Sequence, residues 1–548
     1  QYHNCSAKNS ESAMLSGKHK LALWGGGVAS LLLVTGGLLG LFLAPKVIND
    51  QVVQRDVIGY DTLSNGTRVL NDMTKKWIHP PYEMILHIWM YSVQNEAAFL
   101  AGTEKIRLAQ KGPYAFIEDQ EKIVHEFSPA EDRIFYRNRH RYFFSENHSC
   151  ADCFLNDTVT VPNVLFQKLV DFAETNFVTK FGIEALLTTI GRETPFVTIK
   201  VGQALFEGYD DPLISALCTS KLLAWICKTA KIPDRIGFFY GQNNTDDGLY
   251  EVGTGKTGPS ELGKMYTWNN STALPLTFWD SPYARAINGT DGQLFPPLLK
   301  KDVVLPLFAS QACRSVKMAY VDDSEYQGVN SWRYSTPLSM YDPTQPDNHI
   351  FCHVNSTVSY FDNTTVQYPG CLPAGMIDLS KCQPGEPRVY LSQAHFLMSP
   401  KEVWSAVDGL DAPADERDTT YVDIEPTSGV VIYAKRVMQV NVGMKKGNLG
   451  VLSSTHNVIV PVFWVNETAS VDPETRDQLA NQLQLAKRGA FIGGLSALII
   501  GALLFIGVAL IVLLDLALGN RDEDSEPLVQ QNGQGEVNEG ADPVSQEE

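Results

Sequence analysis

Two cysteines and a histidine in one short stretch are the first candidates for chemistry. The sequence "HSCADC" places His148 beside Cys150 and Cys153, a spacing found in metal-binding and thiol redox sites. The same two cysteines can instead form a structural disulfide bond. The ten glycosylation sequons of the same region indicate an oxidising compartment, so we interpret the pair as a disulfide.

Other catalytic motifs are incomplete. "GTGKTG" would be a phosphate-binding loop only if glycine stood where Tyr250 stands, and "NNTDDG" lacks the ligand number and the glutamate of a calcium loop. Neither G-x-S-x-G nor H-E-x-x-H occurs. The sequence therefore predicts no enzyme, no catalytic residues, no metal site and no cofactor.

Composition limits the class of protein further. The 548 residues carry a net charge of −18, and 44% of them are hydrophobic. A nucleic-acid binder would need a basic face, so nucleic acid is excluded as a partner. The length suffices for a large folded core.

Two uncharged segments predict membrane spans at both ends of the chain. Residues 21–44 and 489–514 are each long enough to cross a hydrocarbon core of about 30 Å as a helix. The first is longer than the apolar core of a signal peptide, and Pro45 follows its only small-residue cleavage position. We therefore predict two anchors, with Gly36 and Gly40 as a weak helix-pairing signal.

The region between the spans, residues 45–488, is predicted to be extracellular or lumenal. It contains eight of the nine cysteines, an even number that suits a disulfide framework. Ten N-glycosylation sequons support the same side of the membrane. They are Asn65, Asn147, Asn156, Asn243, Asn269, Asn270, Asn288, Asn355, Asn363 and Asn466.

Both tails are then expected in the cytosol. Residues 1–20 form the N-terminal tail, in which we interpret residues 1–13, before Met14, as non-native. Residues 515–548 are acidic and predicted to be disordered. Within them, Asp524, Leu528 and Val529 resemble an acidic dileucine signal for sorting adaptors, with valine as a departure; an accidental apolar pair is an equally good reading.

The region between the spans alternates short β-rich runs with Gly, Pro and Asn turns, which predicts a large antiparallel sheet or barrel. Residues 162–231 differ, because apolar residues there recur at spacings of three and four. Pro162 and Asn163 form a helix-start signal, and Gly191 a helix-stop signal. The fold class is thus an α+β membrane protein with a helical bundle on a β-barrel.

Ordered short motifs resemble one family. "TLSNGT", "KGPY", "GYDDPL", "INGTDGQLFPP", "CRSV", "YVDIEPTSG" and "PVFWVNE" follow one another between the two spans. In this order the chain resembles the class B scavenger receptors, most nearly the lysosomal member of that family. The resemblance covers residues 21–514.

The resemblance implies an antiparallel barrel capped by helices far from the membrane and crossed by a hydrophobic tunnel. It also implies disulfides Cys313–Cys382 and Cys352–Cys371. The implied function is a receptor that binds lipoprotein, anionic phospholipid, fatty acid or sterol and moves lipid through the tunnel. The alternative is a lysosomal cargo or adhesion receptor that acts through the helical apex, and homo-oligomers are compatible with either.

The apex is where the chain departs from the family pattern. Cys218 and Cys227 would lie about 13 Å apart in one continuous helix, too far for a disulfide. Either the helix breaks between them, or they pair with Cys150 and Cys153.

No histidine lies between His148 and His349, so the apical histidine that is the proposed pH sensor of the family's lysosomal member is missing. Candidate apical ligand contacts are Lys168, Lys180 and Arg192. The expected location is a lysosomal, endosomal or plasma membrane.

Overall fold

The computed structural model describes residues 17–191, 195–353, 360–362, 366, 368 and 370–523. The chain forms two compact units, one of Gln1–Val47 with Lys487–Glu548 and the other of Ile48–Ala486. The first unit holds the two apolar segments, and the second holds almost all of the region between them.

The apolar segments are helical. The first comprises α1 (Gly17–Leu38), a π-helical turn (Leu39–Leu43) and α2 (Ala44–Arg55); the second is α13 (Leu485–Glu523). By length and composition, His19–Arg55 and Pro473–Ala517 can each cross a membrane. Both predicted spans lie inside these ranges.

Glycines bring the two helices of the first unit into backbone contact. A Cβ atom on Gly37 would lie 2.8 Å from the carbonyl oxygen of Gly494, and one on Gly40 would lie 3.0 Å from the Gly494 Cα. Gly36 has nothing within 4 Å of its Cβ position in the described chain. Of the predicted Gly36–Gly40 pair, only Gly40 therefore packs, together with Gly37, because those two share the helix face that meets α13.

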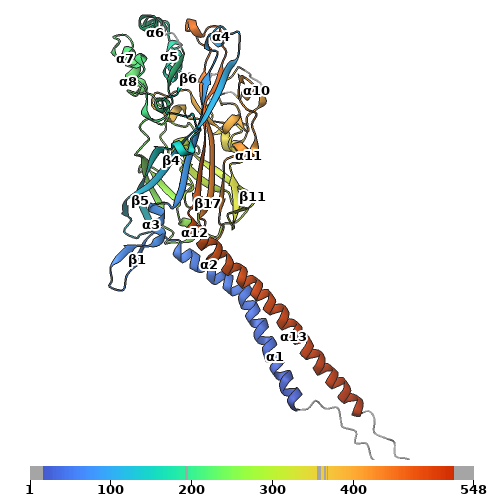
Figure 1. The fold of residues 1–548 in the computed structure, drawn as a ribbon. Coiled ribbons are helices and arrows are strands. Elements are labelled where there is room, and N and C mark those ends of the chain that lie inside the picture. Colours follow the sequence, from blue (N-terminus) through green and yellow to red (C-terminus); the bar gives the residue numbers. More distant parts are fainter. Residues whose placement is uncertain are drawn as a thin grey trace, which may run out of the picture. The chain divides into compact units, whose positions relative to one another are not determined.

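The second unit is built on one 14-stranded sheet (Figure 1). Its central path runs β10-β11-β12-β16-β17-β18-β3-β4-β5-β8-β9, and the register along this path is antiparallel. The strands of this path are β3 (Tyr82–Val93), β4 (Ile106–Phe127), β5 (Arg133–Phe144), β8 (Thr245–Gly253), β9 (Met265–Trp268), β10 (Leu305–Ala309), β11 (Arg314–Tyr326), β12 (Val329–Ser335), β16 (Tyr421–Ile424), β17 (Val431–Met444) and β18 (Val458–Val471). The remaining strands are β1 (Tyr60–Thr62), β2 (Arg68–Leu70), β6 (Thr158–Pro162), β7 (Phe196–Lys200), β13 (Met376–Asp378), β14 (Val389–Ser392) and β15 (Val407–Asp408).

The sheet is nearly closed into a barrel. The two ends of the strand path, β9 and β10, are joined by the segment around Gly289 and Thr290. The Met265 amide donates to the Gly289 carbonyl at 2.7 Å, and the Phe308 amide donates to the Thr290 carbonyl at 2.9 Å. The predicted antiparallel barrel is confirmed in this nearly closed form.

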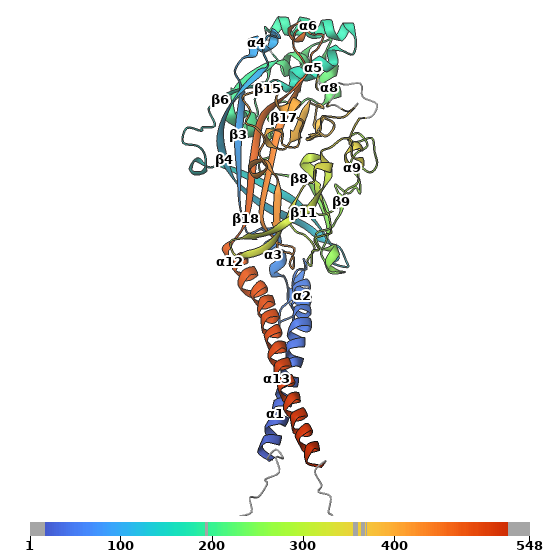
Figure 2. The ribbon, with the colours of Figure 1, turned by 90° about the vertical axis from the view of Figure 1, so that its right-hand side faces the viewer.

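Helices α5–α8 cap one end of the second unit, and the chain enters and leaves this unit at the opposite end, near α3 and α12 (Figure 2). The helices of the second unit are α3 (Asp72–Ile78), α4 (Glu96–Leu100), α5 (Val164–Ala173), α6 (Phe177–Ile190), α7 (Pro212–Thr219), α8 (Ala224–Ala230), α9 (Pro346–His349), α10 (Lys401–Trp404), α11 (Asp415–Asp418) and α12 (Pro473–Asp477). The cap is not purely helical, because β7 lies between α6 and α7.

The helix ends follow from local sequence. The Asn163 side chain accepts a hydrogen bond from the Phe166 amide and so caps α5, as Asn176 caps α6 through the Thr179 amide. Gly191 ends α6 in a left-handed conformation with a φ of 63°. The predicted start and stop signals therefore fall at the helix ends.

Candidate ligand cavity and apical patch

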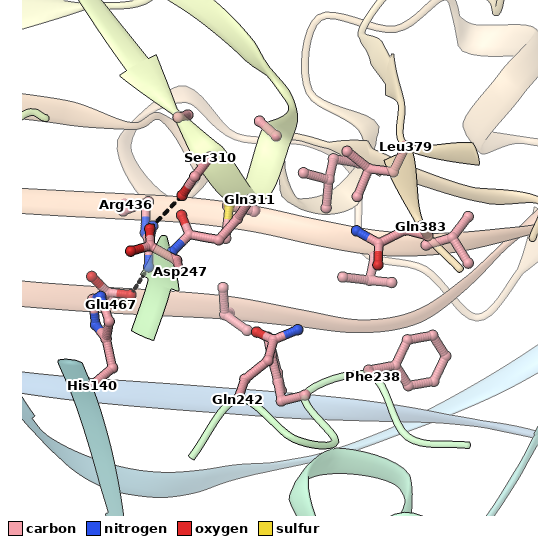
Figure 3. Close-up of a pocket in the computed structure, with 18 of the residues that line it drawn as sticks. His140, Phe238, Gln242, Asp247, Ser310, Gln311, Leu379, Gln383, Arg436 and Glu467 are labelled. Carbon is pink, nitrogen blue, oxygen red and sulfur yellow. Dashed lines mark hydrogen bonds and ion pairs between the residues drawn. The ribbon is translucent and has the colours of Figure 1, made fainter. Parts of the chain in front are cut away.

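A cavity of about 810 Å³ runs inside the sheet of the second unit (Figure 3). Strands β3, β4, β5, β8, β17 and β18 line it, together with residues 232–242 and 377–393. Its volume lies in the range of small-molecule sites, about 300–1,000 Å³. The cavity is thus large enough for a lipid-sized molecule.

The alternation of strand side chains gives much of this cavity an apolar wall. Successive residues of a strand point to opposite faces, so every second residue of β18 faces inward. Phe463, Val465 and Ala469 line the cavity, as do Met438 and Val440 of the neighbouring β17. The loop residue Phe238 packs edge-on against Phe463, with ring centroids 5.2 Å apart.

Charged side chains interrupt this apolar wall. Arg436 forms an ion pair with Glu467, and His140 Nδ1 lies 2.8 Å from Glu118 Oε1. Burial raises the pKa of Glu467 despite the nearby Arg436. Burial also acts to raise the pKa of Glu118, but hydrogen bonding and charge from His140 hold it below its usual value. The two carboxyl groups of this cluster therefore have pKa values shifted in opposite directions.

Asp247 is the second polar feature of the wall. Its Oδ2 accepts a hydrogen bond from Ser310 Oγ at 2.5 Å and another from the Tyr250 hydroxyl (Figure 3). Its Oδ1 is buried and accepts no hydrogen bond among the described residues. Burial raises the pKa of this carboxyl group. Because its Oδ1 has no described partner, Asp247 offers a polar atom that a ligand in the cavity can use.

The structure joins Cys218 to Cys227, and Cys150 to Cys153, by disulfide bonds. Of the two arrangements that helix geometry left open, the helix break is the one observed. Helix α7 ends at Thr219 and α8 begins at Ala224, which brings the Cys218 and Cys227 Cα atoms to 5.5 Å. The turn between these helices is thereby fixed at its base.

This turn contributes to an exposed apolar surface on the helical cap, which we call the apical patch. Its members are large hydrophobic side chains that are exposed by between 44% and 79%. They are Phe177, Val178 and Phe181 of α6, with Leu222 and Trp225 of the α7–α8 region. The two parts are contiguous, because a Cβ atom on Gly182 would lie 2.8 Å from Leu222 Cδ2.

The predicted apical contacts are engaged with carboxyl groups or lie outside the described residues. Lys168 is only 16% exposed; it donates to the Glu386 carbonyl at 3.1 Å, and burial lowers its pKa. Lys180 lies 3.7 Å from Glu184. Arg192 lies outside the described residues.

Sequence reasoning missed three other cations. Lys221, Lys228 and Lys231 are exposed beside Leu222 and Trp225, and none forms an ion pair with a described residue. The signal was present in "CTSKLLAWICKTAKIP", where lysines alternate with apolar side chains. Only the helix break shows that both kinds of side chain reach the same surface.

The other two disulfides, Cys313–Cys382 and Cys352–Cys371, are the pairs that the resemblance implies. Two cysteine-containing clusters have metal-like spacing in the described chain, around His349 and around Asp152. Their cysteines are all in disulfides and cannot supply thiolate ligands.

Sequons of the described chain lie mainly on the surface. The exposed acceptors are Asn65, Asn147, Asn156, Asn243, Asn269, Asn270 and Asn288. Asn466 differs, since it lies on β18 with a buried Oδ1 that has no described partner. Asn355, Asn363 and the sorting residues Asp524, Leu528 and Val529 lie outside the described residues.

The sequence matches the CD36 family over residues 27–513. It is 28% identical to human lysosome membrane protein 2 over 459 residues, which cover 84% of this chain and 88% of the relative. It is 25% identical to mouse scavenger receptor class B member 1, with 84% and 83% covered. An uncharacterized protein of Caenorhabditis elegans is 30% identical, with 72% and 80% covered.

The family match and the two named relatives, together with two terminal helices able to cross a membrane, support a two-span membrane protein with a class B scavenger receptor family role. The chain belongs to the CD36 family, as its resemblance to class B scavenger receptors predicted. It is a membrane protein of the lysosomal or plasma membrane, and its named relatives are membrane proteins and receptors.

Proposed function

We propose that this protein is a class B scavenger receptor that captures lipid-bearing ligands and passes lipid through the cavity of its ectodomain. The observation that carries the proposal is the cavity of about 810 Å³ with an apolar wall. Each methylene group kept out of water is worth about 0.8 kcal/mol, so an enclosed apolar path lowers the barrier to lipid transfer. Transfer down a gradient needs no catalytic group.

The proposed topology has residues 1–20 and 515–548 in the cytosol, spans at residues 21–44 and 489–514, and residues 45–488 outside or in the lumen. The helical cap, residues 162–231, would meet the ligand first. The cavity supports this direction, because Leu165 and Ile232 of the cap line one part of it and Tyr82, at the end where the chain enters, lines another.

The apical patch supports capture of a lipid surface. Aromatic and aliphatic side chains flanked by lysines are typical of segments that insert into the interface of anionic lipid. Phe177, Phe181 and Trp225 would enter the lipid surface, while Lys221 and Lys228 would meet phosphate groups. The ligand is then a lipoprotein or a membrane that exposes anionic phospholipid.

The polar wall favours lipids whose polar end is uncharged. Asp247 and Glu467 line this part of the cavity, and Glu118 lies behind them against His140. The carboxylate of a free fatty acid would be repelled there by these carboxyl groups, or would have to take up a proton. A sterol hydroxyl could instead donate to the unpaired Oδ1 of Asp247. We therefore place sterols ahead of fatty acids among the transported lipids.

The test is to block the cavity from within. Val440→Trp adds bulk to the inner face of β17, and Ile117→Trp adds the same group to the exposed outer face of β4. We expect lipid extraction and mass spectrometry of the purified full-length receptor to find bound lipid in the wild type and in Ile117→Trp. Cellular sterol uptake should fall only with Val440→Trp. Uptake that is unchanged in a correctly folded Val440→Trp variant would refute transport through this cavity.

A second candidate function is a cargo or adhesion receptor that acts through the cap alone. The exposed apical patch favours it, since such a patch can also bind a protein. This function predicts that changes in the apical patch abolish ligand binding while Val440→Trp leaves the receptor's activity unchanged.

A further inference from the structure

One arginine of the second unit is fully buried and forms no ion pair with a described residue. Arg314 opens β11 directly after Cys313 and is 1% exposed. Its Nη1 and Nη2 both donate to one oxygen, Asn348 Oδ1, at 3.3 Å. Its Nε donates to no acceptor among the described residues. Four or more strong acceptors would normally surround such a group.

The guanidinium keeps its charge in this site. Burial lowers the pKa of Arg314 to about 9, so the group is still protonated at neutral and acidic pH. Its face lies 3.4 Å above the ring of Phe351, a contact that helps but does not neutralise the charge. A buried charge without a counter-ion costs several kcal/mol. The site therefore calls for an anion.

A small pocket adjoins this charge. Arg314, Asn348, Phe351 and His353 line a pocket of about 20 Å³, together with the Cys352–Cys371 disulfide. That volume holds one water molecule or one monatomic ion but not phosphate or a carboxylate.

A second buried nitrogen lines the same pocket. His353 Nε2 is buried and forms no hydrogen bond within the described chain. The one acidic side chain of the pocket, Asp378, lies 3.5 Å from His353 Nε2 and accepts hydrogen bonds from Ser380. Asp378 forms no ion pair with Arg314 in the described chain, so it does not supply the missing charge.

We propose that this pocket is a structural halide site, in which a single chloride ion accepts hydrogen bonds from Arg314 and neutralises its charge. Chloride is monatomic, accepts hydrogen bonds and is abundant outside cells. In this pocket the Arg314 charge favours the ion and the Asp378 carboxylate opposes it. The ion would hold the start of β11 against the Cys352–Cys371 disulfide. This inference concerns stability and does not depend on the proposed lipid transport.

The test measures halide-specific stability of the full-length receptor in detergent. We expect its melting temperature to rise by about 3 °C when chloride replaces gluconate at constant ionic strength, at about one hundred times the dissociation constant. The constant ionic strength removes general screening from the comparison. Equal melting temperatures in chloride and gluconate would overturn the proposal.

Two variants assign the effect to this pocket. Asn348→Asp provides a fixed carboxylate for Arg314, so the variant should be as stable in gluconate as in chloride. Arg314→Met removes the charge and should also lose the chloride effect. If Arg314→Met does not fold, Asn348→Asp still decides, because a chloride effect of undiminished size in that variant would place the ion elsewhere. Crystals of the receptor soaked in bromide should show an anomalous peak beside Arg314, and its absence would contradict the site.

Discussion

Asp56 makes the stability of the second unit depend on pH within the physiological range. It follows α2 directly, and its carboxyl group is partly buried with an Oδ2 that has no hydrogen-bond partner in the described chain. Burial raises its pKa from 3.8 to about 7; the negative charge of Glu425 adds to the increase and Arg55 opposes it. Substituting this carboxyl group should therefore change how stability responds to pH.

The sign and size follow from linkage. The folded state holds the Asp56 proton more tightly than the unfolded state. The protonated carboxyl group therefore contributes its full stabilisation below a pH of about 3.8, and this stabilisation is lost as the pH rises to about 7. Between about pH 5 and about pH 7.4 the loss amounts to at most about 2.5 kcal/mol. For a folded unit of roughly 440 residues, this corresponds to about 3 °C in melting temperature.

The assay compares Asp56→Asn with the wild type by tryptophan fluorescence of the full-length receptor. Asparagine does not titrate, so the variant should gain about 3 °C more over the wild type at about pH 7.4 than at about pH 5. Asp61→Asn on the exposed strand β1 is the matched control and should show the same small difference at both pH values. A gain for Asp56→Asn that does not change with pH would refute the reasoning.

Three further predictions concern the helices, the cap and the tail. Gly37→Val should separate α1 from α13, because its Cβ position lies 2.7 Å from the Leu498 nitrogen, whereas Gly36→Val should not. Cross-linking between Gly26→Cys and Val508→Cys measures this, because the Gly26 Cβ position lies 3.1 Å from the Val508 side chain. Joint substitution of Phe181→Ser and Trp225→Ser should weaken binding to anionic liposomes at least about tenfold, and Tyr283→Ser, an exposed residue outside the patch, should not. Replacing Leu528 and Val529 by alanine should shift the receptor from lysosomes to the cell surface, as measured by microscopy. An unchanged distribution would show that these residues are not a sorting signal.

The sequence predicted the parts of the fold that depend on composition and local pattern. The two spans follow from uncharged length, and the ends of α5 and α6 follow from Asn163 and Gly191. It predicted less where geometry across the chain decides. Helix rise alone left two partners for Cys218, and only the break after Thr219 selects Cys227.

The cavity could be expected only from the family resemblance. Its polar wall pairs residues that are far apart in sequence: His140 with Glu118, and Arg436 with Glu467. No local sequence pattern connects the members of either pair. The face of α1 that packs against α13 could not be predicted from the sequence either. Gly36 and Gly37 are adjacent, and only the way the two helices cross shows that Gly37 meets α13. Three-dimensional pairing, not residue type, carries this information.

The buried ionisable groups of the second unit have opposite effects in acid. Burial raises the pKa of Asp56 to about 7, so the folded state takes up this proton as the pH falls from about 7 toward 5. Burial also raises the pKa of Asp247 and of Glu467. Burial lowers the pKa of His87, which makes the folded state less stable below about pH 6.5.

The pKa of Asp56 rises from 3.8 to about 7, so this carboxyl group alone stabilises the folded state progressively as the pH falls toward 5. Carboxyl groups whose pKa is lowered do not change the balance. Asp342 is an example, since hydrogen bonds from Thr344 lower its pKa, and its stabilising effect is lost only below the pH at which free aspartate titrates, about 4. The Asp56 carboxyl group therefore makes the second unit more stable at about pH 5 than at about pH 7.4. This response to acid does not depend on a histidine of the cap, because the sequence has none between His148 and His349.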